Sequence, residues 1–144
     1  LLRSLSMKLK PKRFYRQSAV IPYRITNDRL EIVLITSSSS KHWIFPKGIM
    51  EPKMTPEASA AKEALEEAGV IGKSSSNLIF EYEYEKWGGL CQVQVYPLEV
   101  TQLLSNWEEM DFRKRTIVEI SEAIQMIKAD QKPSLERLKE LLSV

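Results

Sequence analysis

Three glutamates lie close together in a short alanine-rich segment, and their side chains are the clearest candidates for chemistry. The stretch from residue 48 to residue 70 reads GIMEPKMTPEASAAKEALEEAGV, and its clustered acids are Glu63, Glu66 and Glu67. On a helix that turns about 100° per residue, these three side chains fall within an arc of about 100°. The small residues Ala64 and Ala68 occupy the other side. The spacing predicts an amphipathic helix with a small-residue face against the core and a carboxylate face outward.

The carboxylate cluster is compatible with two interpretations. Like charges three or four residues apart destabilise an isolated helix by only a few tenths of a kcal/mol per pair, so the cluster alone is also typical of a solvated acidic face. However, Lys47 and Gly48 precede the helix in a loop that could fold over the same face. Carboxylates beside a backbone carbonyl are the oxygen ligands that Mg²⁺ and Mn²⁺ prefer. The segment is therefore a candidate metal site.

The same segment resembles the Nudix box. That pattern runs glycine, five residues, Glu, seven residues, Arg-Glu, an apolar residue, any residue, Glu-Glu, any residue, glycine and an apolar residue. Two positions depart from it, because Met54 stands in place of the first glutamate and Lys62 in place of the arginine. That pair commonly forms an orienting contact in the family, and an unpaired lysine can turn into water more easily than an arginine. The matching positions are Gly48, Glu63, Ala64, Glu66, Glu67, Gly69 and Val70.

The resemblance implies a fold and a chemistry. The expected fold is the α/β class Nudix sandwich, an α/β/α arrangement with a mixed sheet, a central Nudix helix and two C-terminal helices. Nudix enzymes hydrolyse a nucleoside diphosphate linked to another group, or a related polyphosphate, with a divalent metal. We expect Glu63, Glu67, Glu66 and the Gly48 carbonyl to hold Mg²⁺, with Mn²⁺ as an alternative. All three glutamates are expected to be catalytic, and Glu66 is our choice for the base that orients or deprotonates the attacking water.

Two further segments narrow the resemblance. KHWIFPKGIMEP, and NWEEMDFRKR followed by a strand and EISEAI, are similar to the diphosphoinositol polyphosphate phosphohydrolase branch, which also cleaves dinucleoside polyphosphates. This implies a small-molecule polyphosphate substrate. Two alternatives remain open: a pyrophosphatase for ADP-ribose, a nucleotide sugar or another nucleoside-diphosphate-linked compound, and a catalytically weakened Nudix module that binds a regulatory ligand. The residues expected to bind substrate are Arg16, Ser38, Ser39, Lys47, Gly48, Arg113 and Lys114.

The elements that must position these residues follow from hydrophobic patterns. β-Branched runs at 17–24 and 30–36 flank a turn-like cluster and predict an antiparallel hairpin. Thr55 is a suitable N-cap, Pro56 suits the first helical position, and Gly69 is a natural stop. Pro46 and the two residues after it are expected to break any strand. The other expected elements are a short apolar segment at 43–45, strands at 78–85, 90–100 and 115–120, and helices at roughly 121–129 and 133–143.

Two other groups of acids are interpreted as solvated. In the strand expected at 78–85, glutamates alternate with Tyr82 and Tyr84, so acids and aromatic rings must lie on opposite faces. Glu108 and Glu109 follow a tryptophan in a polar stretch, and we expect them to face water.

The overall composition sets limits on the class of protein. A chain of 144 residues fits one domain, which we place at 13–144 after a flexible basic tail at 1–12. The net charge of +2 does not indicate a stable nucleic-acid partner. No apolar run approaches the roughly 18 to 20 residues that span a bilayer, so no membrane association is expected. The single cysteine, Cys91, excludes an internal disulfide, and a cytoplasmic location is the default.

Overall fold

The strands form one mixed sheet that holds the rest of the chain. The computed structural model describes residues 13–143, so the basic tail predicted at 1–12 lies outside the described residues. Strand β1 pairs in parallel with β7, and all other pairings are antiparallel. The order is β3-β2-β1-β7-β5, while β4 pairs with β1, β8 with β2 and β6 with β7. The strands are β1 (Phe14–Thr26), β2 (Arg29–Thr36), β3 (Trp43–Ile44), β4 (Lys47–Ile49), β5 (Val70–Ser74), β6 (Phe80–Lys86), β7 (Gly89–Leu103) and β8 (Arg115–Glu119).

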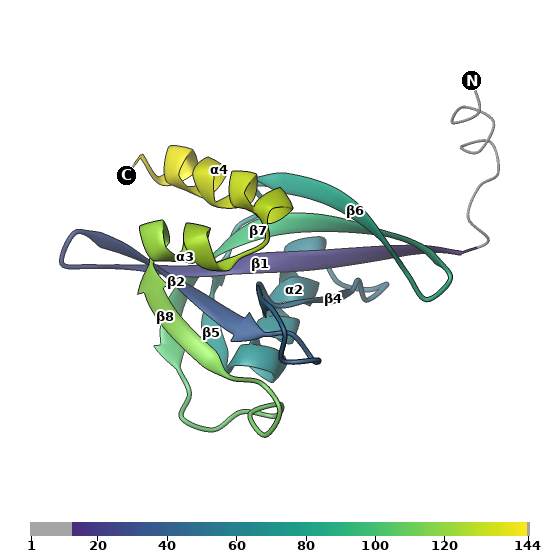
Figure 1. Cartoon of the computed structure of the whole chain (residues 1–144), viewed down its shortest axis with the longest axis horizontal. Coiled ribbons are helices and arrows are strands. Elements are labelled where there is room, and N and C mark those ends of the chain that lie inside the picture. The colour runs from purple at the N-terminus through teal and green to yellow at the C-terminus, as the bar shows by residue number, and fades with distance from the viewer. Residues whose placement is uncertain (1–12, 144) are drawn as a thin grey trace.

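Helices cover both faces of this sheet. Helix α2 (Pro56–Ala68) lies on one side of the long strand β1, and α3 (Ile120–Met126) and α4 (Lys132–Leu142) lie on the other (Figure 1). A short 3₁₀ helix, η1 (Ala129–Gln131), leads into α4. Each face has its own buried cluster: Ala60, Ala64 and Ala68 of α2 pack on one, and Leu135 and Leu138 of α4 pack on the other. The predicted α/β/α sandwich is confirmed.

The first hairpin shows why the local sequence gives this sheet. Asn27 and Asp28 join β1 to β2, and both have left-handed backbone angles, φ 52° and φ 64°. A two-residue loop with positive φ at both positions matches the right-handed twist of the strands, and Asn and Asp tolerate that conformation best after glycine. The predicted hairpin is therefore confirmed, with strands longer than the sequence patterns indicated.

The structure differs from the sequence expectations at three places. Lys47 and Gly48, which were expected to break a strand together with Pro46, instead belong to β4. The Pro46 carbonyl accepts a hydrogen bond from the Val20 amide, and the residues after Pro46 pair with β1. Strand β5 was not predicted, since it is short and Gly72 interrupts its pattern at a bulge. The helix predicted at 121–129 ends at Met126, and η1 follows it.

The termini of α2 follow the predicted signals. The Thr55 side chain accepts a hydrogen bond from the Ala58 amide, and Gly69 ends the helix at φ 64°. Its apolar side is lined with alanines, which allows the helix to lie close to the strands. No helix within residues 13–143 is long and apolar enough to cross a membrane.

We predict that Ala64→Leu destabilises the protein by about 1–3 kcal/mol, because Ala64 is fully buried between α2 and the sheet and a larger side chain would overpack that layer. Chemical denaturation would measure the change. Leu65→Ala is the matched control, since Leu65 is 41% exposed on the same helix, and it should change stability by less than about 0.5 kcal/mol. Equal effects of the two substitutions would contradict this packing.

Candidate metal-dependent active site

The centre of the site is a close approach between the backbone of β4 and two glutamates of α2. The Lys47 amide donates a hydrogen bond to Oε1 of Glu67 at 3.2 Å. Glu63 lies so near Gly48 that a Cβ at position 48 would stand 2.4 Å from the Glu63 carboxyl carbon. Only glycine leaves that space. The sequence-predicted Gly48, Glu63 and Glu67 are therefore brought together, as the resemblance implied.

The carboxylate side of α2 is less exposed than expected. Glu67 is 5% exposed, because β4 passes directly over it, while Glu63 and Glu66 are partly buried. Burial raises the pKa of Glu67 to about 8; the nearby Arg113 acts in the opposite direction. Burial also raises the pKa of Glu63, and the charge of Glu66 adds to this effect. A buried carboxyl and a partly buried one, both with a raised pKa, are suited to a bound cation.

Lys62 is exposed, but it is not unpaired. Its ammonium donates to Oε1 of Glu51 at 2.7 Å and lies 3.9 Å from Oε2 of Glu66. Glu51 therefore pairs with the Lys62 ammonium, which the Met54 side chain could not do. The amide of Glu51 also donates to the Ser59 hydroxyl, and its carbonyl accepts from the Met54 amide. The loop between β4 and α2 thus remains tied to the helix despite both departures from the pattern.

A second carboxylate group forms beside Glu66. The Glu109 amide donates to the Glu66 carbonyl, so the segment between β7 and β8 lies against the end of α2. One carboxylate oxygen from each of Glu66, Glu108 and Glu109 lies within 4.8 Å of the others. The prediction that Glu108 and Glu109 face water is correct for Glu108, which is exposed, but Glu109 is partly buried. Their sequence spacing gives no sign of this contact, which arises from the return of the chain to α2.

The two arginine side chains of the basic cluster at 113–115 make hydrogen bonds within the protein. Arg113 is largely buried, its Nε lies 2.7 Å from Oε1 of Glu109, and its Nη1 donates to the Thr36 carbonyl. Arg115 donates to the carbonyls of Ala68 and Leu104, so it closes the C-terminal end of α2. Arg113 therefore lies close to the carboxylates, where its charge lowers the pKa of Glu67, and its side chain is hydrogen-bonded to Glu109 and Thr36.

The remaining predicted substrate-binding residues lie around the site in different positions. Arg16 is exposed on β1, and its carbonyl accepts from the Met50 amide, beside the loop that leads to α2. Ser38 and Ser39 are exposed in the turn after β2. A polar cavity of about 190 Å³ lies next to this turn and is lined by Thr36, Ser40, Lys41, His42, Trp43 and Lys114. Lys114 is thus placed with the serine turn, although Ser38 and Ser39 themselves do not line the cavity.

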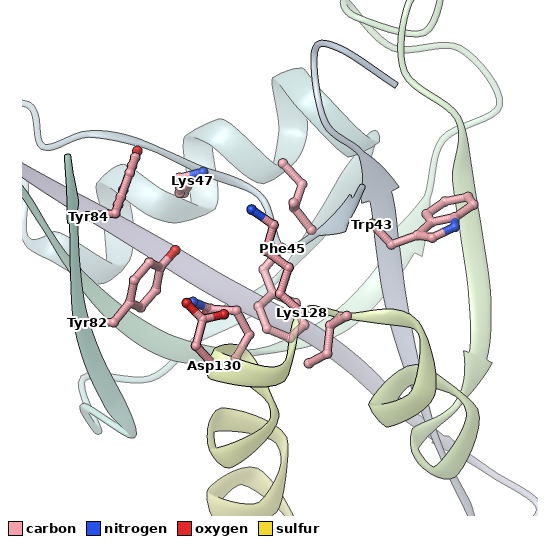
Figure 2. A pocket seen from close by; sticks show the side chains of 10 residues that line it. Trp43, Phe45, Lys47, Tyr82, Tyr84, Lys128 and Asp130 are labelled. Carbon is pink, nitrogen blue, oxygen red and sulfur yellow. The ribbon is translucent and has the colours of Figure 1, made fainter. Parts of the chain in front are cut away.

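A second cavity was not predicted: an aromatic cavity of about 150 Å³ on the α3–α4 face of the sheet. Tyr82 and Tyr84 of β6 form one side, and Lys128 and Asp130 reach in from the segment before α4 (Figure 2). The expected separation of acids and rings on β6 is confirmed, because the tyrosines are partly buried and the intervening glutamates are exposed. The other lining residues are Trp43, Ile44, Phe45, Lys47, Ile127 and Gln131.

Lys47 connects the aromatic cavity to the carboxylates. Its amide holds Glu67, whereas its side chain lines the cavity and its ammonium lies 5.5 Å from the centre of the Tyr84 ring. Burial lowers the pKa of Lys47. The Tyr84 hydroxyl donates to Oε1 of Gln17 at 2.7 Å, which fixes the ring. The alternation of tyrosine and glutamate on β6 was a sequence signal for the aromatic side of this cavity. No local pattern indicated the lining residues that come from the segment before α4.

Comparisons with known proteins bear on the family and the fold. The family model described as NUDIX domain matches residues 15–138. The chain is 35% identical to diphosphoinositol polyphosphate phosphohydrolase 3-alpha of Mus musculus, over 91% of this chain and 80% of the relative. It is 30% identical to Nudix hydrolase 13, mitochondrial, of Arabidopsis thaliana, over 88% and 73%. A C. elegans Ap4A hydrolase in a binary complex superposes with a TM-score of 0.76, covering 90% of this chain and 98% of that chain at 20% identity.

The chain belongs to the Nudix family. Its matched curated relatives include phosphohydrolases, and the chain is a Nudix hydrolase related to diphosphoinositol polyphosphate phosphohydrolases. The predicted family and fold are confirmed. The roles of the individual site residues remain predictions.

We predict that Gly48→Ala lowers hydrolytic activity by about 100-fold, because the new Cβ would displace the Glu63 carboxyl by about an ångström or more. Steady-state hydrolysis assays would measure the loss, and circular dichroism would check that the fold is retained. Ile49→Ala is the control, since Ile49 is 48% exposed next to the same position. Full activity in Gly48→Ala would show that the contact between β4 and Glu63 is dispensable.

We also predict that the protein without metal becomes less stable as pH rises from 5 to 8. The pKa of Glu67 is about 8 in the folded state and near 4.5 when unfolded, so between these values the folded state binds the extra proton and stability falls with rising pH. Thermal unfolding in the presence of a chelator should show a decrease of roughly 5 °C or more. Glu67→Gln, which cannot ionise, should flatten this dependence; an unchanged slope would contradict the assignment to Glu67.

Proposed function

We propose that this Nudix hydrolase cleaves a diphosphate linkage in a dinucleoside polyphosphate, with Mg²⁺ as cofactor. The observation that carries the proposal is the convergence of Glu63 and Glu67 on the β4 backbone at Gly48. Their oxygens fit a hard divalent cation, and the raised pKa of both carboxyls fits a pair that ionises when a cation is present. When bound, Mg²⁺ would supply charge neutralisation of the diphosphate and a more acidic water.

The chain's own residues would then have distinct tasks. Glu63 and Glu67 hold the cation together with the Gly48 carbonyl. Glu66 is partly exposed at the edge of this group and accepts the proton of the attacking water; Glu109 stands beside it as a further carboxylate. Lys47 presents positive charge between the carboxylates and the aromatic cavity, where a polyphosphate would pass. Positioning and charge stabilisation of this kind supply most of the catalysis in phosphoryl-group chemistry.

A diphosphoinositol polyphosphate is the second candidate substrate. It is favoured by the 35% identity to a relative named as a diphosphoinositol polyphosphate phosphohydrolase. The polar cavity that contains Lys41 and Lys114 could accept a further phosphate of either substrate. A cytoplasmic location remains the default, because the single cysteine, Cys91, is buried and forms no disulfide within the described residues.

A hydrolysis panel with Mg²⁺ tests the proposal. Diadenosine polyphosphates, diphosphoinositol phosphates, ADP-ribose and nucleoside triphosphates would be incubated with wild-type protein and with Glu66→Gln. We expect cleavage of the diadenosine polyphosphates, its loss on chelation, and a decrease of about 100-fold or more in Glu66→Gln. Glu108→Gln is the matched control, since Glu108 is the exposed member of the same acidic group, and it should retain more activity than Glu66→Gln.

Three outcomes would contradict parts of this proposal. Binding of a panel compound without any cleavage would identify a regulatory module. Cleavage of ADP-ribose alone would show that the proposed substrate class is wrong. Full activity in Glu66→Gln would remove that residue as the base while leaving the metal site intact.

A further inference from the structure

Ser18 carries a buried hydroxyl for which the fold supplies no partner. The residue is fully buried in β1, and its Oγ has no hydrogen-bond partner within the described part of the chain. Gln94 lies opposite Ser18 on β7, but its Oε1 accepts a hydrogen bond from the Tyr96 hydroxyl instead. A buried hydroxyl without a partner costs free energy, and native structures normally provide one from the protein, from water or from a ligand. The position of Ser18 in the sheet indicates which group that partner is.

The side chain of Ser18 points toward helix α2. Side chains alternate along a strand, and Val20, two residues later, packs in the cluster that contains the α2 alanines. Ala19 packs in the cluster on the other face, and the Gln17 side chain accepts a hydrogen bond from Tyr84 there. Ser18 therefore lies beneath α2, on the face of the sheet that carries the carboxylates.

The strand register places Ser18 beside Glu63. Ser18 lies directly opposite Gly48 in the antiparallel pair of β1 and β4. Side chains of directly opposite residues project from the same face, with Cβ atoms about 4.5–5.5 Å apart. A Cβ at position 48 would stand only 2.7 Å from Oε1 of Glu63. Because position 48 is glycine, no side chain from β4 separates the Ser18 hydroxyl from the Glu63 carboxyl.

The hydroxyl suits a carboxylate that holds a cation. An ionised carboxylate can only accept hydrogen bonds, whereas a serine hydroxyl can donate one. Carboxylates that ligate a metal are normally held by such donors, which fix their orientation, and loss of one typically weakens metal binding by about ten- to 100-fold. The Lys47 amide is a donor of this kind for Glu67. Ser18 stands in the corresponding place for Glu63.

We infer that Ser18 is a positioning residue for the metal site, and that its hydroxyl donates to the Glu63 carboxylate when that carboxylate binds the divalent cation. The inference rests on the proposed function, because it takes Glu63 and Glu67 as the ligands of the cation. Ser18 is fully buried, so it acts through Glu63 and does not touch the substrate. This role accounts for a hydroxyl in a layer otherwise packed largely with apolar side chains.

Mn²⁺ binding, measured by electron paramagnetic resonance, tests this without substrate or turnover. Ser18→Ala removes the hydroxyl with little change in volume, and we expect it to weaken Mn²⁺ binding about ten-fold. Its melting temperature without metal should equal that of the wild type or exceed it, because a hydroxyl without a partner contributes no hydrogen bond to lose. Ser18→Thr keeps the hydroxyl and should restore Mn²⁺ binding.

Ser134→Ala is the matched control. Ser134 is also fully buried, but it lies in α4 on the other side of the sheet, and its hydroxyl donates to the Gln131 carbonyl. The same chemical change there should lower the melting temperature by about 3 °C, because a hydrogen bond is lost. It should leave Mn²⁺ binding unchanged. One substitution is therefore expected to affect metal binding without loss of stability, and the other to affect stability alone.

Equal Mn²⁺ affinity in the wild type and Ser18→Ala would overturn the inference. A loss of the same size in Ser134→Ala would also overturn it, as would a folded Ser18→Thr protein that binds Mn²⁺ no better than Ser18→Ala. If Ser18→Thr does not fold, the contrast between Ser18→Ala and Ser134→Ala carries the test.

The outcomes separate this inference from the proposed function. If Ser18→Ala binds Mn²⁺ as the wild type does while the wild type cleaves diadenosine polyphosphates, the inference fails and the hydrolytic proposal stands. If Mn²⁺ affinity falls as expected in Ser18→Ala but no panel compound is cleaved by the wild type, the role of Ser18 stands and the hydrolytic proposal fails. No Mn²⁺ binding by the wild type at millimolar concentration would overturn both.

Discussion

The contact between the β4 backbone and two glutamates of α2 is the constraint on which the rest of the site depends. It buries Glu67 and presses Glu63 against Gly48, and both changes raise the pKa of the carboxyls. Burial of carboxylates lowers the stability of the fold unless positive charges or hydrogen-bond donors nearby compensate for the lost water. The amide of Lys47 and the nearby Arg113 provide part of that compensation, and a divalent cation would provide the rest.

Four sets of contacts in the sheet and the loops hold β4 and α2 in this arrangement. β4 is fixed by pairing with β1, and α2 is fixed by its alanine face on the sheet. The salt bridge between Lys62 and Glu51 ties the connecting loop to the helix, and Arg115 closes the helix end. Met54 and Lys62 therefore do not open the site, because Glu51, three residues earlier, supplies the missing carboxylate. Exposed ion pairs are weak individually, so this bridge serves position more than stability.

Local patterns predicted much of this molecule and missed what depends on distant parts of the chain. Thr55 and Gly69 gave the limits of α2 within a residue, and the glutamate spacing put the three acids on one side of that helix, since both follow from helix geometry. The burial of Glu67 could not be predicted, because it depends on β4 crossing the helix. The approach of Glu109 to Glu66 depends on a return of the chain after some 40 residues, and the aromatic cavity unites β6 with the segment before α4. Such contacts leave no periodic signal.

The most direct test of the central claim is to locate the metal. Crystals of the protein soaked in Mn²⁺ would be measured at a wavelength where manganese scatters anomalously. The account predicts an anomalous peak in contact with the carboxylates of Glu63 and Glu67 and the carbonyl of Gly48. A peak found only at the group formed by Glu66, Glu108 and Glu109, or no peak at either group, would contradict it.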